Sequence, residues 1–132
     1  MEKGYYKPEI EEFCIGLQIE VFQPALNKYH LCPFTEKCNF YEYNIDLCRV
    51  KLLDREDIES CGFKEVGGVD ADSALYFMND KFAIIFEPEN SDDNIPALVI
   101  YSDIDTNEQT SIFSGTIRNK TEFKKLLKQL GI

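Results

Sequence analysis

The sequence predicts an α+β fold, with an antiparallel β-meander of about six to seven strands, a short central helix and a C-terminal amphipathic helix. Three observations predict it. Segments with apolar residues at every second position recur along the chain, which is typical of half-buried strands. Asp54 and Gly62 bracket one short helical segment, and the end of the chain has apolar residues at helical spacing. A length of 132 residues predicts a single domain over 1–132.

The N-terminal part predicts an arm, a strand and an irregular segment. Residues 1–9 predict an extended arm, in which Tyr5 and Tyr6 pack on the body of the protein or on a neighbouring molecule. Apolar residues at odd positions predict a strand over 15–22. Residues 24–40 contain two prolines and no sustained period, so they predict an irregular excursion.

Strand character returns at 41–47, after which the apolar residues move from odd to even positions. A strict alternation cannot make that change, so the sequence predicts a β-bulge or a sharp bend near Asp46–Arg49.

The central helix has signals at both ends. The Asp54 carboxylate can accept hydrogen bonds from the free N–H groups of the first turn, and Gly62 can take the left-handed conformation of a helix stop. A helix of about two turns needs tertiary contacts to form. The residues predicted to make those contacts are Ile58, Cys61 and Phe63.

The C-terminal half predicts a strand over 63–69 and then a β-hairpin. Strands over 73–78 and 81–87 flank Asn79–Asp80, which predicts a two-residue loop. This register sets Phe77 opposite Phe82 and Leu75 opposite Ile84. The strand at 82–86 is apolar on both faces, which predicts a central place in the sheet. An acidic loop follows at 87–95, and then strands at 97–101 and 110–117. The last helix is predicted to be capped by Asn119 and Glu122, and its apolar stripe consists of Phe123, Leu126, Leu127 and Leu130.

Charge and cysteine content narrow the function. The chain has 24 acids and 14 bases, a net charge of −10, which argues against nucleic acid as a partner because phosphates would be repelled. Residues 118–132 carry a net charge of +4 and residues 1–117 a net charge of −14, which predicts either attraction within the chain or an electrostatically steered partner. Five cysteines and no signal-peptide pattern predict free thiols in a reducing cytoplasm, and no apolar run is long enough to predict a membrane span.

No constellation predicts catalysis, a metal or a cofactor. The spacing of His30, Cys32, Cys38 and Cys48 differs from the close pairs that zinc sites use, so scattered thiols are the preferred interpretation. The segment from Asp103 to Asn107 begins like a calcium loop, but Glu108 stands where that loop needs glycine. With one histidine and no catalytic motif, the sequence predicts a protein that is not an enzyme.

Two sets of residues are candidates for partner binding. The first is the tyrosine pair of the arm, Tyr5 and Tyr6. The second is a basic stripe at positions i, i+4 and i+8 of the last helix, formed by Lys120, Lys124 and Lys128. This stripe is either a solvated face that complements the helix dipole or a patch for an anionic partner or another copy of the chain in a homo-oligomer.

Three segments carry a resemblance to a known group of proteins: YKPEIEEFCIG near the start, LLDREDIESCGFK in the middle and GTIRNKTEFKKLLKQLGI at the end. In this pattern the chain resembles small uncharacterised accessory proteins of tailed bacteriophages. The resemblance implies a protein that acts in a bacterial cytoplasm. The leading hypothesis is a non-enzymatic module that binds a protein through a sheet edge, the aromatic arm or acidic loops, and inhibits a host defence factor. The alternatives are a protein that sequesters a small molecule or nucleotide, and a virion or assembly component.

Overall fold

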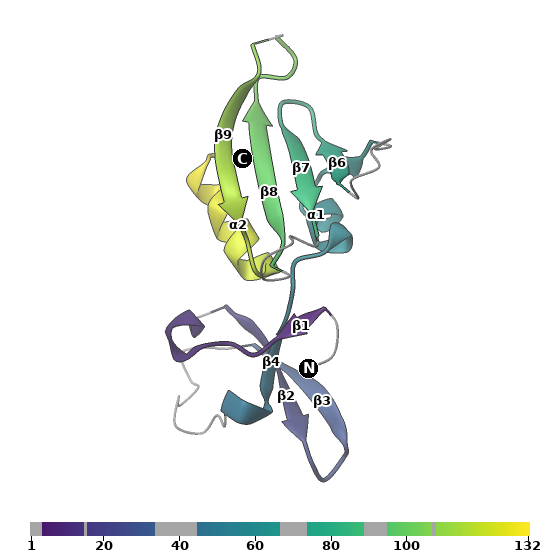
Figure 1. Cartoon of the computed structure of the whole chain (residues 1–132), viewed down its shortest axis with the longest axis vertical. Helices are drawn as coiled ribbons and strands as arrows, with labels where there is room; N and C mark the ends of the chain where they lie inside the picture. The colour runs from purple at the N-terminus through teal and green to yellow at the C-terminus, as the bar shows by residue number, and fades with distance from the viewer. Residues whose placement is uncertain (1–3, 15, 34–44, 67–73, 89–94, 107) are drawn as a thin grey trace. The chain divides into compact units, whose positions relative to one another are not determined.

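The computed structural model describes residues 4–14, 16–33, 45–66, 74–88, 95–106 and 108–132. It shows a mixed α+β protein with two antiparallel sheets and two α-helices (Figure 1). The predicted fold class is confirmed, but the single meander of six to seven strands is wrong, because the first four strands form a sheet of their own. Contacts divide the chain into two compact units, residues 1–52 and 53–132. The single domain predicted over 1–132 stays a prediction.

The N-terminal unit contains a four-stranded antiparallel sheet with the order β1-β4-β2-β3. Its core is small, with Leu17, Ile19, Cys48 and Val50 buried. The elements are β1 (Tyr5–Tyr6), the 3₁₀ helix η1 (Ile10–Glu12), β2 (Gln18–Gln23), β3 (Lys28–Pro33), the 3₁₀ helix η3 (Ile45–Leu47) and β4 (Cys48–Lys51).

The predicted excursion over 24–40 is wrong in its first half, because β3 pairs with β2 along its whole length. Asn27 turns the chain between them with φ at 52°, a left-handed conformation that asparagine tolerates. The strand was missed because Tyr29 and Leu31 lie on one face and His30 and Cys32 on the other, which leaves no polar–apolar alternation. Residues 34–40 lie outside the described part of the chain.

The predicted arm is part of the N-terminal sheet over its described residues. Tyr5 and Tyr6 pair with Lys51 and Val50 of β4, and Gly4 O accepts a hydrogen bond from the Leu52 N–H at 2.8 Å. The expectation of a bend near Asp46 is confirmed, because η3 turns the chain immediately before β4. The predicted strand over 41–47 is wrong at residues 45–47, and residues 1–3 and 41–44 lie outside the described part.

The C-terminal unit contains a five-stranded meander with the order β5-β6-β7-β8-β9, in which β7 is central as predicted. Both helices pack on one face of this sheet, since residues of α1, α2 and the strands share one buried core (Figure 1). The elements are α1 (Arg55–Ser60), β5 (Lys64–Glu65), β6 (Leu75–Met78), β7 (Ala83–Glu87), β8 (Ala97–Ser102), β9 (Thr110–Thr116) and α2 (Lys120–Gln129). No helix in the described ranges is long and apolar enough to cross a membrane.

The β6–β7 hairpin differs from its predicted register by two residues. Phe77 pairs with Ile84 and Leu75 with Phe86, in place of the predicted partners Phe82 and Ile84. The Asn79 side chain causes the longer connection, because its Oδ1 accepts hydrogen bonds from the N–H groups of Lys81 and Phe82 at 3.0 and 2.7 Å. A shift of two residues keeps every side chain on its own face, so the apolar pattern fits both registers.

The helix caps follow the prediction closely. Asp54 Oδ1 accepts a hydrogen bond from the Asp57 N–H at 2.9 Å, and Gly62 ends the first helix with φ at 97°. Asn119 Oδ1 likewise accepts from the Glu122 N–H at 2.8 Å at the start of α2. Glu122 departs from the predicted capping box, because its carboxylate accepts from the Arg118 N–H. Of the predicted contacts, Ile58, Phe63, Phe123, Leu126 and Leu127 are buried, and Cys61 and Leu130 are half-buried against the same core.

Candidate functional site

The face of the five-stranded sheet opposite the helices has an apolar centre with polar residues beside it, because the register also places Lys64 opposite Met78 and Ser114 opposite Val99. Residues that pair directly across strands lie on the same face, so the strand register sorts them. Phe77, Ile84 and Ile100 face the helices and are fully buried. The other face has two rows, one joining Tyr76, Ile85 and Val99 and one joining Met78, Ala83 and Tyr101, and Val66 extends the first row through its hydrogen bond to Tyr76 O. We call these seven residues the apolar face: Val66, Tyr76, Met78, Ala83, Ile85, Val99 and Tyr101.

Two residues of the apolar face are strongly exposed. Val66 is 40% exposed and Met78 is 39% exposed, whereas the other five are half-buried among their neighbours in the sheet. Leu26 and Leu31 of the described N-terminal unit are more exposed, at 56% and 63%, but they are not part of the apolar face. A contiguous apolar surface of this kind marks an interaction site more often than scattered hydrophobic residues do.

The edges of the same sheet carry features that discourage strand pairing. The pairing of β9 with β8 shifts register at Ile112, which has no partner opposite it, and such a bulge twists an edge strand away from flat pairing. The other edge, β5, has only two residues and includes Lys64. The apolar face is therefore better suited to binding another molecule than either edge of the sheet.

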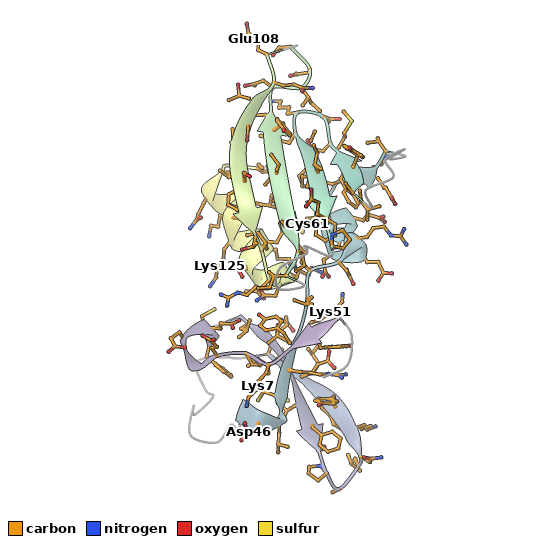
Figure 2. All side chains as sticks on the ribbon, viewed as in Figure 1. Lys7, Asp46, Lys51, Cys61, Glu108 and Lys125 are labelled. Atoms are coloured by element: carbon orange, nitrogen blue, oxygen red, sulfur yellow. The ribbon has the colours of Figure 1, made fainter. Side chains whose placement is uncertain are left out.

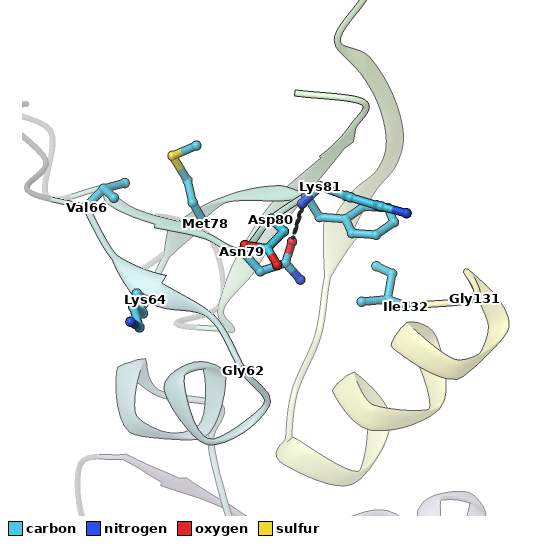
Figure 3. Close-up of a pocket in the computed structure, with 10 residues that line it drawn as sticks. Gly62, Lys64, Val66, Met78, Asn79, Asp80, Lys81, Gly131 and Ile132 are labelled. Carbon is cyan, nitrogen blue, oxygen red and sulfur yellow. Dashed lines mark hydrogen bonds between the residues drawn. The ribbon is translucent and has the colours of Figure 1, made fainter. Parts of the chain in front are cut away.

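A groove of about 730 Å³ lies at the end of the sheet that carries the β6–β7 turn, and its lining comes both from the apolar face and from the side of the helices (Figure 3). Val66 and Met78 line one part of it, and Phe82 and Ile132 line another. Lys64 and Lys81 also line it, so it offers apolar contact together with positive charge. The groove can accept a large apolar side chain of a partner.

A half-buried polar cluster lies in the N-terminal sheet, around Arg49. Its guanidinium stacks between two aromatic rings, 3.7 Å from the Tyr5 centroid and 3.6 Å from the Tyr29 centroid. Glu20 Oε1 accepts a hydrogen bond from Arg49 Nη2 at 2.9 Å. Phe22 packs on Tyr29 with centroids 5.2 Å apart. Since Arg49 is buried and paired, this cluster stabilises the unit and holds β1 on β4.

The predicted partner-binding residues fall into three different environments. Tyr5 stacks on Arg49, and the Tyr6 hydroxyl donates a hydrogen bond to Glu12 Oε2 at 2.6 Å, so both tyrosines have structural contacts within their own unit. A second ion pair, between Lys7 and Asp46, also fastens this segment (Figure 2). On α2, Lys124 and Lys128 are exposed and Lys120 is half-buried, and partner binding by this stripe stays a prediction.

The sequence did contain one signal for the apolar face. The strand around Ile84 and Ile85 is apolar on both sides, which predicted a central position in the sheet. That position is correct, but only one of the two faces is covered by the helices. Periodicity cannot separate an apolar face covered by the same chain from one left for a partner.

Metal-ligating side chains do not converge in the described part of the chain, where no group of three or more His, Cys, Asp or Glu residues is placed to hold an ion. His30 and Cys32 lie two positions apart on one face of β3, and Cys38 lies outside the described residues. The absence of a metal and of a cofactor stays a prediction.

Cys48 is expected to be the least reactive of the four cysteines that the structure describes. Burial raises the pKa of its thiol, and the nearby Cys32 raises it further, so less of the reactive thiolate forms. Cys14, Cys32 and Cys61 are half-buried. A short pulse of iodoacetamide at pH 8, followed by peptide mass spectrometry, should label Cys48 more slowly than these three, and in urea all four rates should converge. Equal labelling of folded protein would contradict this.

Comparison with known proteins adds no family to this geometry. No family model, no curated protein and no solved structure matches the chain.

Proposed function

We propose that this protein is a non-enzymatic module that binds another protein through its apolar face. The observation that carries the proposal is the exposure of Val66 and Met78 on a sheet face with Tyr76, Ile85 and Tyr101, while the opposite face already packs on two helices. Covering apolar surface gains about 25 cal/mol for each Å² removed from water. Tyrosine and methionine are also enriched at protein interfaces, where a few such residues supply most of the binding energy.

Of the three surfaces expected from the sequence, the edges and the arm are less well suited than the apolar face, and residues 89–94 of the predicted acidic loop lie outside the described part of the chain. The bulge in β9 and the short β5 oppose strand addition, and Tyr5 and Tyr6 are engaged with their own unit. The resemblance to tailed-phage accessory proteins suggests a partner among proteins of a bacterial host, acted on in the cytoplasm, and inhibition of a host factor is the simplest consequence of covering one of its surfaces.

A second candidate function is sequestration of a small anionic molecule. The groove that contains Lys64 and Lys81 favours it, because two lysines beside apolar side chains suit a ligand with an anionic and an apolar part. A virion or assembly role has less support, since Tyr5 and Tyr6 of the arm pair with β4 of their own sheet.

The experiment is a pull-down from bacterial lysate with a double variant, Val66→Glu with Met78→Glu. Both positions are exposed, so we expect the variant to fold, and two buried carboxylates at the interface should lower partner recovery at least tenfold. The matched control, Gln23→Glu with Gln129→Glu, adds the same charge at exposed positions that belong to neither the apolar face nor the turns beside it. Circular dichroism checks the fold of each variant.

Mass spectrometry of the retained material decides between the candidates. A single protein that is retained by the wild type and the control but lost by the double variant supports binding through the apolar face. Equal recovery with the double variant would exclude this surface. A small molecule that elutes with the wild-type protein, in the absence of a protein partner, would favour sequestration.

A further inference from the structure

Two turns at one end of the five-stranded sheet lie side by side. The Ile104 N–H donates a hydrogen bond to Lys81 O at 3.4 Å, which joins the β8–β9 turn to the β6–β7 turn. Lys81 is the one base in these two turns, against four acids, so their net charge is −3. The four acids are exposed, and we call them the acidic rim: Asp80, Asp103, Asp105 and Glu108, the last labelled in Figure 2.

The acidic rim borders the apolar face. Ala83 and Tyr101 pair with each other and form the row of the apolar face nearest to these turns. Asp103 follows Tyr101 by two residues, a separation of about 7 Å along a strand. A partner that covers Tyr101 therefore brings its own charged groups within reach of the rim, inside the distance over which charges interact at physiological salt.

We infer that the partner of the apolar face is a protein segment with basic residues beside its apolar contacts, positioned over the acidic rim. This inference rests on the proposed function. Charge complementarity supports this inference in two ways. The acidic rim attracts a basic segment once the segment is bound, and the net charge of −10 of the whole chain attracts it from a distance. Both the acidic rim and the net charge of the chain would repel an acidic segment. Lys64 and Lys81 at the groove oppose this trend but are outnumbered by the four acids of the rim.

A second copy of this chain fits the requirement poorly. Its basic surface is on α2, where Lys124 and Lys128 are exposed. The apolar stripe of that helix, however, is buried in its own core through Phe123, Leu126 and Leu127. The copy would bring positive charge without the apolar side chains that the apolar face needs, so a different protein is the better occupant.

Two synthetic peptides test the inference by ¹⁵N NMR titration of the full chain. They share leucine and phenylalanine at helical spacing and differ only in having lysine or glutamate at every polar position. The lysine peptide is expected to bind at least tenfold more tightly at low salt and to shift the amide signals of the apolar face and the acidic rim.

The matching variant neutralises three of the four acids of the rim: Asp103→Asn, Asp105→Asn and Glu108→Gln together. Asparagine tolerates the left-handed conformation of Asp103, whose φ is 56°. The variant should weaken the lysine peptide about tenfold and reduce its salt dependence. The control, with Glu9→Gln, Glu11→Gln and Glu59→Gln, removes the same charge from exposed positions elsewhere and should weaken it less than about twofold.

The outcomes separate the inference from the proposed function. If both peptides shift the apolar face with equal affinity, the basic requirement is overturned and the proposed surface stands. If the control weakens binding as much as the rim variant, overall charge acts alone and the rim has no role. If neither peptide shifts signals of the apolar face, the proposed surface itself is overturned.

Discussion

Replacing Arg49 with alanine is expected to destabilise the N-terminal unit by about 3 kcal/mol, because it removes a buried ion pair and two cation–π contacts together. The Arg49 side chain is 10% exposed and its partner Glu20 is 22% exposed, so the carboxylate left behind is poorly hydrated. Among the described residues of this unit, the buried core cluster consists of Leu17, Ile19, Cys48 and Val50, and a small core leaves little stability in reserve. In a ¹⁵N NMR spectrum, signals from the N-terminal unit should collapse while those of the C-terminal unit persist.

Arg55→Ala is the matched control for this prediction. The Arg55 side chain is 54% exposed, and its Nη1 lies 3.7 Å from Glu65 Oε2. The loss of this exposed ion pair should change the free energy of unfolding by under about 1 kcal/mol. Arg49→Lys should fall between the two, because lysine keeps the charge but loses the planar stacking on both rings. Equal stability of the two alanine variants would show that the stacked arginine contributes nothing special.

Replacing Phe123 with alanine is expected to destabilise the C-terminal unit by about 3–5 kcal/mol. Phe123 is fully buried on α2 and belongs to the core that joins both helices to the sheet. Its loss leaves a cavity under α2, so both the transfer free energy and the packing of the surrounding residues are lost. Urea unfolding followed by circular dichroism measures the change.

Lys124→Ala provides the control at the neighbouring position, which is exposed on the same helix. Alanine has a slightly higher helix propensity than lysine, so this change should stay within about 0.5 kcal/mol. If Phe123→Ala were as mild, α2 would not be fixed by the shared core.

Local chemistry determined which parts of the fold were predictable. The caps at Asp54 and Asn119 were correct because each depends on one side chain and the backbone of the next turn. The register of the β6–β7 hairpin was wrong by two residues, because the apolar pattern is unchanged by an even shift. The stack of Tyr5, Arg49 and Tyr29 joins three strands that are distant in sequence, so no local pattern marks it.

The candidate site was less predictable than the fold. A place in an extended arm predicts that Tyr5 and Tyr6 are partner-binding residues. Pairing with β4 gives both tyrosines contacts inside their own unit instead. The apolar face is assembled from three strands and Val66, and its members are recognisable only once the register is known. The excess of negative charge is visible in the sequence, and four of the acids lie together in the acidic rim.

The two sheets differ in how far apart their paired strands lie in the sequence. In the C-terminal unit every strand pairs with the next one in the chain, whereas β4 must enter between β1 and β2, joining the beginning of the N-terminal unit to its end. Contacts between residues distant in the sequence slow folding, because bringing the two ends of a long loop together costs conformational entropy before the contact forms. The β2–β3 hairpin is therefore expected to form early, the core of the N-terminal unit to close last, and the meander to fold faster than the sheet that precedes it.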